Sequence, residues 1–253
     1  MKRLAILSLM LLSITANAQY KIIAHRGASG VAPENTVASA NKAWELGADA
    51  VEIDVHLSRD NKVMVIHDKN TRRTTGESYD IAETGSDTLR MLDAGSFKSP
   101  EYKGEKIPFL EEVIATIPEG KTLFVEIKSD RKIVPFIKEI VDNSDKKDQI
   151  VFIAFDLSTI VEAKTSMHNN KCYWLSAYHF QLKKGIVKAA RAGLEGIDLR
   201  YGIINEKVME RAGNYKLEVL AWTVDKPKEA KKLTDLGVTG ITTNKPDLMK
   251  KEL

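Results

Sequence analysis

Short apolar runs alternate with helical patterns along nearly the whole chain, and this alternation restricts the possible folds more than any other feature of the sequence. Eight runs are typical of strands, at residues 22–24, 50–57, 123–127, 150–154, 172–175, 196–199, 217–222 and 240–243. Eight helical patterns follow them, at residues 36–46, 109–117, 134–141, 158–167, 183–192, 206–212, 228–236 and 246–250. Eight strand–helix units in succession predict an α/β fold of the closed (β/α)8 or TIM-barrel type. An open, doubly wound sheet is the alternative, but the number of units favours closure.

One segment interrupts the alternation after the second strand. Residues 63–66 read as a short hairpin partner of that strand, because an Asp60-Asn61 turn separates the two. Residues 70–106 are polar and rich in Gly, Thr and Ser, with only a weak amphipathic piece around Leu89. An excursion of this length is rarely idle, so we expect this insertion to cover the mouth of the barrel. The chain has no internal repeat and no linker, so residues 19–253 are predicted to form one domain.

The start of the chain has the pattern of a secretory signal peptide. A basic head, Met1-Lys2-Arg3, precedes the apolar run 4–12 and the small residues 16–18. This pattern predicts a signal peptide over residues 1–18, with cleavage before Gln19. The apolar run is too short to span a bilayer, so we expect no stable membrane insertion. The protein is therefore predicted to be exported, to the periplasm of a Gram-negative cell or to the extracellular space.

The charge balance excludes some classes of partner. The chain has 38 Lys and Arg against 35 Asp and Glu, and its formal charge of +3 falls to +1 without residues 1–18. A value so near neutrality, with no lysine-rich tail, argues against nucleic-acid binding and favours a small-molecule partner. Cys172 is the single cysteine and cannot form an internal disulfide, so a packed thiol is expected. The oligomeric state is left open by the sequence.

Acidic side chains occupy strands that should be buried. Glu52 and Asp54 stand two residues apart, so their side chains point to one face of the second strand. Glu126 closes the third strand, and the site of a barrel of this kind lies at the carboxyl ends of its strands. Close carboxylates repel one another unless a positive charge lies between them. Three oxygen donors predict a divalent cation, Mg2+ or Ca2+ rather than Zn2+. The alternative is a buried acid network tied to Lys128 and Arg26, which would leave carboxylate oxygens unmatched.

Basic and imidazole side chains are expected around these acids. Arg26 follows the first strand and can hold two oxygens of a phosphate in a fork, while Lys128 adds a point charge. Such an arrangement stabilises the charge that develops when a phosphodiester is attacked. His25 and His67 are the predicted acid–base pair, because one ring can deprotonate the attacking hydroxyl and the other can protonate the leaving oxygen. The sequence does not assign the two roles.

Three further positions carry an alternative interpretation. Trp222 ends the seventh strand and is a core aromatic or, with equal weight, a wall of the substrate pocket. Asn35 is a helix N-cap or a ligand contact. His56 shares the face of Glu52 and Asp54, and a supporting or packing role is favoured over direct contact with the site.

Together these residues form a series of motifs in a recognisable order. The motifs are His25-Arg26-Gly27, Pro33-Glu34-Asn35-Thr36, Glu52-Ile53-Asp54-Val55, His67-Asp68, Arg73-Thr74-Thr75, Glu126-Ile127-Lys128, Trp222-Thr223-Val224 and Gly240-Ile241-Thr242-Thr243-Asn244-Lys245-Pro246. The series resembles the glycerophosphodiester phosphodiesterase family along the whole mature chain. Two positions depart from the family pattern: no leucine precedes the Arg-Thr-Thr motif, and Asp225 stands where many members have asparagine. Both lie outside the residues of the implied chemistry.

The resemblance implies a (β/α)8 barrel that hydrolyses glycerophosphodiesters to glycerol 3-phosphate and an alcohol, in glycerol and lipid metabolism. It implies dependence on a divalent cation and a role for each of the residues above. The metal ligands are then Glu52, Asp54 and Glu126, the acid and base are His25 and His67, and the phosphate is held by Arg26 and Lys128. The attacking group is water at the metal or the substrate's own glycerol hydroxyl, which would form a cyclic phosphate.

Two other functions remain open from the sequence. A phospholipase-like activity on lyso or intact lipids would need an exposed apolar lip, of which residues 70–106 give little sign. A non-catalytic phosphoester-binding protein would keep the pocket without turnover. The presence of both His25 and His67 argues against this second function, because binding alone needs no proton-transfer pair.

Overall fold

A ring of eight parallel strands forms the centre of the protein in this computed structural model, which describes residues 20–253. The ring runs in the order β1, β9, β8, β7, β6, β5, β4, β2, and pairing of β1 with β2 closes it. Its strands are β1 (Lys21–His25), β2 (Ala50–Leu57), β4 (Thr122–Ile127), β5 (Ile150–Ala154), β6 (Lys171–Ser176), β7 (Gly196–Arg200), β8 (Glu218–Trp222) and β9 (Gly240–Thr243). The closed barrel is confirmed. The predicted signal peptide, residues 1–18, lies outside the described residues.

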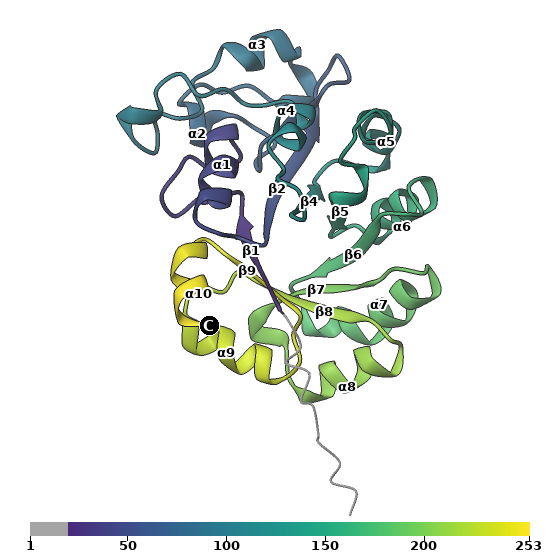
Figure 1. Cartoon of the computed structure of the whole chain (residues 1–253). Helices are drawn as coiled ribbons and strands as arrows, with labels where there is room; N and C mark the ends of the chain where they lie inside the picture. The colour runs from purple at the N-terminus through teal and green to yellow at the C-terminus, as the bar shows by residue number, and fades with distance from the viewer. Residues whose placement is uncertain (1–19) are drawn as a thin grey trace, which may run out of the picture.

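Helices surround the ring on its outer side (Figure 1). They are α1 (Val37–Glu45), α4 (Leu110–Ala115), α5 (Val134–Asp142), α6 (Leu157–Ser166), α7 (His179–Arg191), α8 (Glu206–Asn214), α9 (Pro227–Asp235) and α10 (Pro246–Glu252). Single 3-10 turns occupy η3 (Arg131–Ile133), η4 (Lys147–Gln149) and η5 (Tyr201–Ile203). Helix α7 starts four residues before the predicted segment 183–192, because Leu182 already packs on its buried face. Among residues 20–253, no helix combines the length and the apolar character needed to cross a bilayer.

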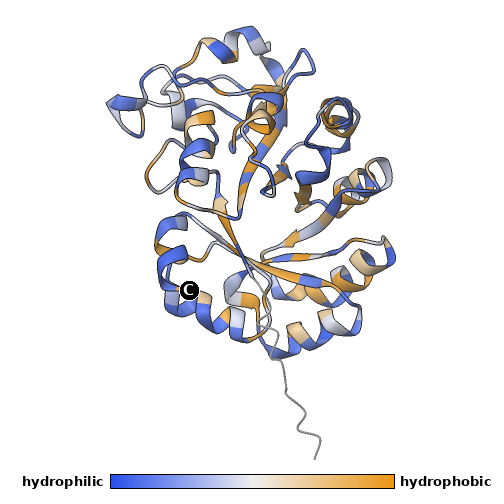
Figure 2. Ribbon diagram, viewed as in Figure 1, coloured by the Kyte–Doolittle hydropathy of each residue, from blue (hydrophilic) through white to orange (hydrophobic). Residues whose placement is uncertain are grey.

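Alternation along each strand divides the core into two layers. On β2, Val51, Ile53 and Val55 pack into the large cluster between the ring and its helices. The residues between them face the barrel interior, whose floor is a smaller apolar cluster. This second cluster consists of Ile23, Ala50, Phe124, Val151, Ile153, Tyr173, Leu175 and Leu220, with Trp222 packed against it. Figure 2 shows the strands as the most hydrophobic part of the ribbon, as expected for a sheet that is covered on both faces.

The insertion lies beside the mouth of the barrel rather than over it. It contains α2 (Arg72–Thr75), η1 (Ile81–Glu83), α3 (Ser86–Met91) and η2 (Pro100–Tyr102), and β3 (Val63–Val65) pairs antiparallel with β2 outside the ring. A small core of its own holds it together, made of Met64, Ile66, Ile81, Leu89, Leu92, Ala94 and Ile107. Lys98 Nζ donates hydrogen bonds to the carbonyls of Ser29 (2.7 Å) and Gly30 (2.9 Å), which ties the insertion to the loop after β1. None of residues 70–106 lines the pocket described below, so the insertion does not form the expected cover over the mouth.

The lone cysteine is a packed thiol, as expected from the sequence. Cys172 on β6 is fully buried, and burial raises the pKa of its thiol to about 12. A thiol with that pKa is protonated at neutral pH and is therefore a poor nucleophile.

Candidate active site

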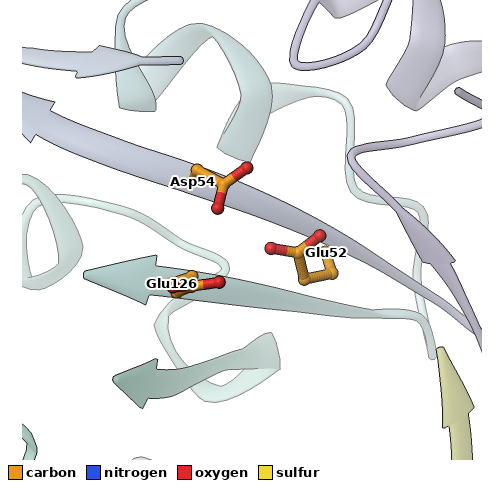
Figure 3. A group of neighbouring side chains, drawn as sticks. All are labelled: Glu52, Asp54 and Glu126. Carbon is orange, nitrogen blue, oxygen red and sulfur yellow. The ribbon is translucent and has the colours of Figure 1, made fainter. Parts of the chain in front are cut away.

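Three carboxylates from two adjacent strands meet inside the barrel mouth. Glu52 and Asp54 project from β2 and Glu126 from β4, and Asp54 is paired in register with Glu126. One oxygen from each residue lies within 4.8 Å of the others, and Figure 3 shows the three groups turned toward one another. All three are buried, at 2%, 1% and 8% exposure respectively. No other cluster of this kind occurs within residues 20–253.

The three carboxyl groups of this cluster have pKa values that are shifted in different directions. Burial, together with the neighbouring Asp54, raises the pKa of Glu52 well above its usual value and that of Glu126 to about 7. Burial alone would also raise the pKa of Asp54, but the charges of Lys128 and Arg26 outweigh it and lower that pKa. The cluster thus contains more carboxyl groups than its two cations can balance.

Two buried oxygens of the cluster test whether a cation fits. Oε1 of Glu52 and Oδ1 of Asp54 have no hydrogen-bond partner among the described residues. An unmatched buried carboxylate oxygen is costly, and native proteins rarely leave one without an ion or a bound water. Three carboxylates and no thiolate or imidazole form a donor set that Mg2+ and Ca2+ prefer. The residues therefore fit a divalent cation, and the acid network without metal would leave these oxygens unmatched.

Arg26 and Lys128 supply positive charge at the edge of the cluster. Arg26 Nε lies 3.4 Å from Asp54 Oδ2, and its Nη1 donates to Glu34 Oε1 at 2.9 Å. Lys128 Nζ lies 2.9 Å from Glu126 Oε1 and 3.6 Å from Asp54 Oδ1. Both side chains line the pocket, so each can face an anion that enters beside the acids.

The backbone after β1 adopts a left-handed conformation that helps to build the cluster. Arg26 has φ 55°, and its amide N–H donates to Glu52 Oε2 at 2.9 Å. Gly27 has φ 76°, and a Cβ atom there would lie 2.4 Å from Ser39 Oγ. A left-handed non-glycine residue costs roughly 1–2 kcal/mol. The hydrogen bond from the Arg26 amide to the Glu52 carboxylate offsets this cost.

His25 is held by a residue that follows β9, the neighbour of β1 in the ring. Its Nδ1 lies 2.8 Å from Oδ1 of Asn244, which follows β9. Asn244 Nδ2 and its backbone N each donate to Asp225 at 2.8 Å, so its amide oxygen must face the imidazole. His25 therefore donates from Nδ1, and its Nε2 lies 4.0 Å from Glu52 Oε2 without a hydrogen-bond partner among the described residues. Burial and the charge of Arg26 lower the pKa of His25. Asp225, expected to lie outside the chemistry, thus acts on His25 through one intervening side chain.

His67 is held by an anion rather than by an amide. Its Nδ1 lies 2.6 Å from Asp68 Oδ1, and hydrogen bonds from Arg73 are the main cause that lowers the pKa of Asp68 to about 2. Arg73 also grips Glu34 through two hydrogen bonds of 2.8 Å, and Glu34 in turn accepts from Arg26. A continuous chain of charged side chains thus connects the His67 imidazole to Arg26. Glu34, Asp68 and Arg73 stood inside recognised motifs, but sequence reasoning gave them no role.

Two residues with open interpretations support the site instead of lining it. Asn35 donates from Nδ2 to Asp54 Oδ2 at 2.8 Å and accepts from the Asp54 amide at 3.0 Å, which orients that carboxylate. The N-cap of α1 is Thr36, so the N-cap expectation for Asn35 was wrong. His56 Nε2 lies 3.0 Å from the carbonyl of His67 and steadies that loop. The supporting role favoured for His56 matches this position.

A pocket of about 230 Å³ opens above the interior cluster and gathers the predicted site residues except Asp54, which lies behind it. Its lining is His25, Arg26, Glu52, His67, Glu126, Lys128, Ile153, Phe155, Leu175, Asp198, Trp222, Thr223 and Thr242. Apart from Asp198 on β7, the ionisable side chains of this lining come from β1, β2 and β4 and from the residues that follow β1, β3 and β4. The β5, β6 and β8 side is apolar, and the Trp222 ring meets that of Phe155 edge-on at 5.5 Å. Trp222 is therefore a wall of this pocket.

Cleavage of a phosphate ester needs fixed cations beside the phosphate and two groups that move protons. The mouth of this barrel provides both within one small pocket, so fold and site together define a barrel enzyme of the phosphoric ester hydrolase class. Residues 25–248 match the Glycerophosphoryl diester phosphodiesterase family, and the chain belongs to that family.

Proteins from several bacteria are similar to this chain in sequence or in fold. YhdW of Bacillus subtilis is 32% identical over 241 residues, which cover 91% of this chain and 97% of that protein. A glycerophosphodiester phosphodiesterase of Caldanaerobacter subterraneus is 30% identical over 233 residues, covering 90% and 95% of the two chains. A solved Oleispira antarctica phosphodiesterase in complex with the product sn-glycerol-3-phosphate is 28% identical, with a TM-score of 0.87 and coverage of 92% and 96%. The chain is an enzyme of this family.

The raised pKa of Glu126 predicts how stability depends on pH when the cluster holds no cation. A folded-state pKa of about 7 lies above the ordinary glutamate value of 4.5, so this group stabilises the fold fully below pH 4.5, and its contribution is lost as pH rises through 7. In excess chelator we expect Tm to fall between pH 5 and 8, on the order of 5 °C more in wild type than in Glu126→Gln. Added Mg2+ or Ca2+ should reverse the fall at pH 8, because cations bind the ionised acids. Equal Tm profiles for the two proteins, measured by calorimetry, would contradict the charge assignment.

Proposed function

We propose that the pocket binds a small glycerophosphodiester at its phosphate and hydrolyses it to glycerol 3-phosphate and an alcohol by acid–base catalysis from two histidines. The observation that carries the proposal is the fixed orientation of both rings beside the acid cluster. His25 and His67 each have Nδ1 engaged, at 2.8 and 2.6 Å, so that Nε2 is the free nitrogen in both. Two oriented bases that line one pocket suit proton transfer more than simple binding.

The phosphate would be held by this chain's cations. Arg26 and Lys128 line the pocket, and each already contacts a carboxylate. A bound phosphate can take the place of that carboxylate or contact the same cation beside it. Glu52, Asp54 and Glu126 would hold a divalent cation, Mg2+ or Ca2+, which neutralises phosphate charge and polarises the phosphoryl group. Trp222 would contact the non-phosphate part of the substrate.

Different partners of the two rings support different roles. The carboxylate of Asp68 binds Nδ1 of His67 and directs Nε2 to the pocket, so we assign to His67 the proton that is donated to the leaving oxygen. Asn244 offers His25 a neutral amide oxygen, and burial together with Arg26 favours the uncharged ring. His25 is therefore suited to accept the proton of the attacking hydroxyl, whether that group belongs to water or to the substrate.

One observation favours a second candidate substrate, a lysophospholipid. Tyr178 and Phe180 follow β6, their rings lie 5.6 Å apart, and they are 56% and 79% exposed. They stand at the carboxyl-end face of the barrel, so they could meet an acyl chain that leaves the pocket. Lysophospholipase D GDPD1 of Homo sapiens is 24% identical over 263 residues, covering 89% of this chain.

The first test is a product assay across substrates and cations. Glycerophosphocholine, glycerophosphoinositol and lysophosphatidylcholine are supplied in turn, and release of glycerol 3-phosphate or lysophosphatidic acid is measured. We expect turnover of the glycerophosphodiesters with Mg2+ or Ca2+ and its loss in excess EDTA, since the acid cluster would lack its counter-charge. Full activity in chelator would contradict the metal role, and preference for the lysolipid would favour the second candidate.

Substitution of either histidine should remove most of the activity. For His25→Ala and His67→Ala we expect kcat to fall about 100- to 10,000-fold, because each variant loses one proton-transfer group. Asp68→Asn removes the anion behind His67 and should cost about 10- to 100-fold. His168→Ala is the matched control, because His168 is exposed and is not one of the residues that line the pocket. A near-normal rate in either catalytic variant, with circular dichroism unchanged, would exclude its proposed role.

We also propose that residues 1–18 are a signal peptide and that the enzyme acts outside the cytoplasm. The basic head, the apolar run and the small residues at 16–18 support this. Intact-mass measurement of the protein expressed with its native start should give a mature chain that begins at Gln19. A mass that retains Met1 in an export-competent host would contradict the proposal.

A further inference from the structure

One buried polar atom of the pocket is not explained by the chemistry above. Four buried side-chain atoms lack a hydrogen-bond partner among the described residues: Arg26 Nε, Glu52 Oε1, Asp54 Oδ1 and Asp198 Oδ1. The first three belong to the residues that would face the cation and the phosphate. Asp198 comes from β7, is 2% exposed, and is not a member of the acid cluster. A buried carboxyl without a partner is costly, so its presence in the pocket wall calls for a ligand.

The surroundings of Asp198 are apolar. Its neighbours in register are Leu175 on β6 and Leu220 on β8, and both belong to the interior cluster. Trp222 Nε1 donates to the Asp198 backbone carbonyl at 3.3 Å, which places the indole beside this carboxyl. Among the lining residues from β5 to β8, Asp198 is the single ionisable side chain. It is thus a lone hydrogen-bonding acid in an otherwise hydrophobic half of the pocket.

Burial, and the charge of Glu126, raise the pKa of Asp198 well above its usual value. A neutral carboxyl group can both donate and accept a hydrogen bond, which suits a hydroxyl partner. Asp198 also lies below the mouth: it precedes the end of β7 by two residues, whereas Phe155 and Trp222 stand at strand ends. The interior cluster closes the space beneath it, so only a small group can reach Asp198.

We propose that Asp198 binds a hydroxyl group of the substrate's glycerol moiety and makes the pocket specific for it. A three-carbon polyol offers C–H surface to Leu175 and Trp222 and hydroxyls to the carboxyl, while the variable alcohol extends toward the mouth. This inference rests on the proposed function, because it places the phosphate between the glycerol moiety and the acid cluster. Asp198 is then a specificity-determining residue, distinct from the acid–base pair.

The test is direct binding of three phosphate monoesters to the enzyme loaded with Mg2+ or Ca2+, measured by calorimetry. The ligands are sn-glycerol 3-phosphate and its two deoxy analogues, propane-1,2-diol 1-phosphate and propane-1,3-diol phosphate. We expect wild type to bind at least one analogue about 10-fold or more weakly than glycerol 3-phosphate, because that analogue leaves the buried carboxyl unpaired. In Asp198→Ala the three affinities should agree within about twofold, whereas Asp198→Asn should keep most of the preference.

Controls separate this role from a merely structural one. Leu175→Ala should weaken all three ligands alike and keep the preference, because Leu175 offers no hydrogen bond. If Asp198→Ala does not fold, Asp198→Val removes the carboxyl with less change in volume and must lose the same preference. Equal binding of the three ligands by wild type, or an unchanged preference in Asp198→Ala, would overturn the proposal.

Two further outcomes are informative. The ratio of kcat/KM for glycerophosphocholine to that for glycerophosphoethanolamine should be the same in wild type and Asp198→Asn. A changed ratio would mean that the carboxyl contacts the head group, and the proposal would fall. Because binding is measured without turnover, loss of the proposed hydrolysis would appear separately, as a wild-type enzyme that cleaves no glycerophosphodiester.

Discussion

Mutual repulsion among buried carboxylates is the constraint on which the site depends. Register between β2 and β4 brings Asp54 beside Glu126, and the two-residue period of β2 adds Glu52 on the same face. The surrounding structure then acts to make this crowding tolerable, through two cations, a left-handed backbone donor at Arg26 and the amide of Asn35. The oxygens that remain unmatched after these contacts fit a divalent cation.

The two imidazoles illustrate how a barrel can give equivalent side chains different properties. His25 is oriented by a neutral amide that an aspartate locks from behind, and His67 is oriented directly by a carboxylate. Only His67 has a carboxylate as its hydrogen-bond partner, whereas the nearest carboxylate oxygen to the His25 ring, Glu52 Oε2, lies 4.0 Å from Nε2. The difference arises from loops after three separate strands, and the barrel holds those loops at one rim.

Local periodicity made the fold and the acid cluster predictable. Strand–helix alternation predicted the closed ring, and the spacing of Glu52 and Asp54 predicted their common face, because both depend on short-range geometry. Contacts between loops were not predictable, since they depend on side-chain conformations across long separations: Asn244 meets His25 over 219 residues. The prediction that residues 70–106 cover the mouth of the barrel was wrong for the same reason. Asp198 could have been noticed as an acid inside an apolar strand, but nothing adjacent in the sequence indicated its surroundings.

Apart from the buried Asp198, the pocket keeps its ionisable groups on one arc of the ring and its apolar wall on the other. A substitution at Leu175 on the apolar arc leaves the ion pairs untouched, whereas a change to Arg73 or Glu34 disturbs several partners at once. Mutational tolerance should therefore differ between the two arcs. Apolar side chains of the β5 to β8 arc can change one at a time, while the ion-paired side chains of the opposite arc must change together.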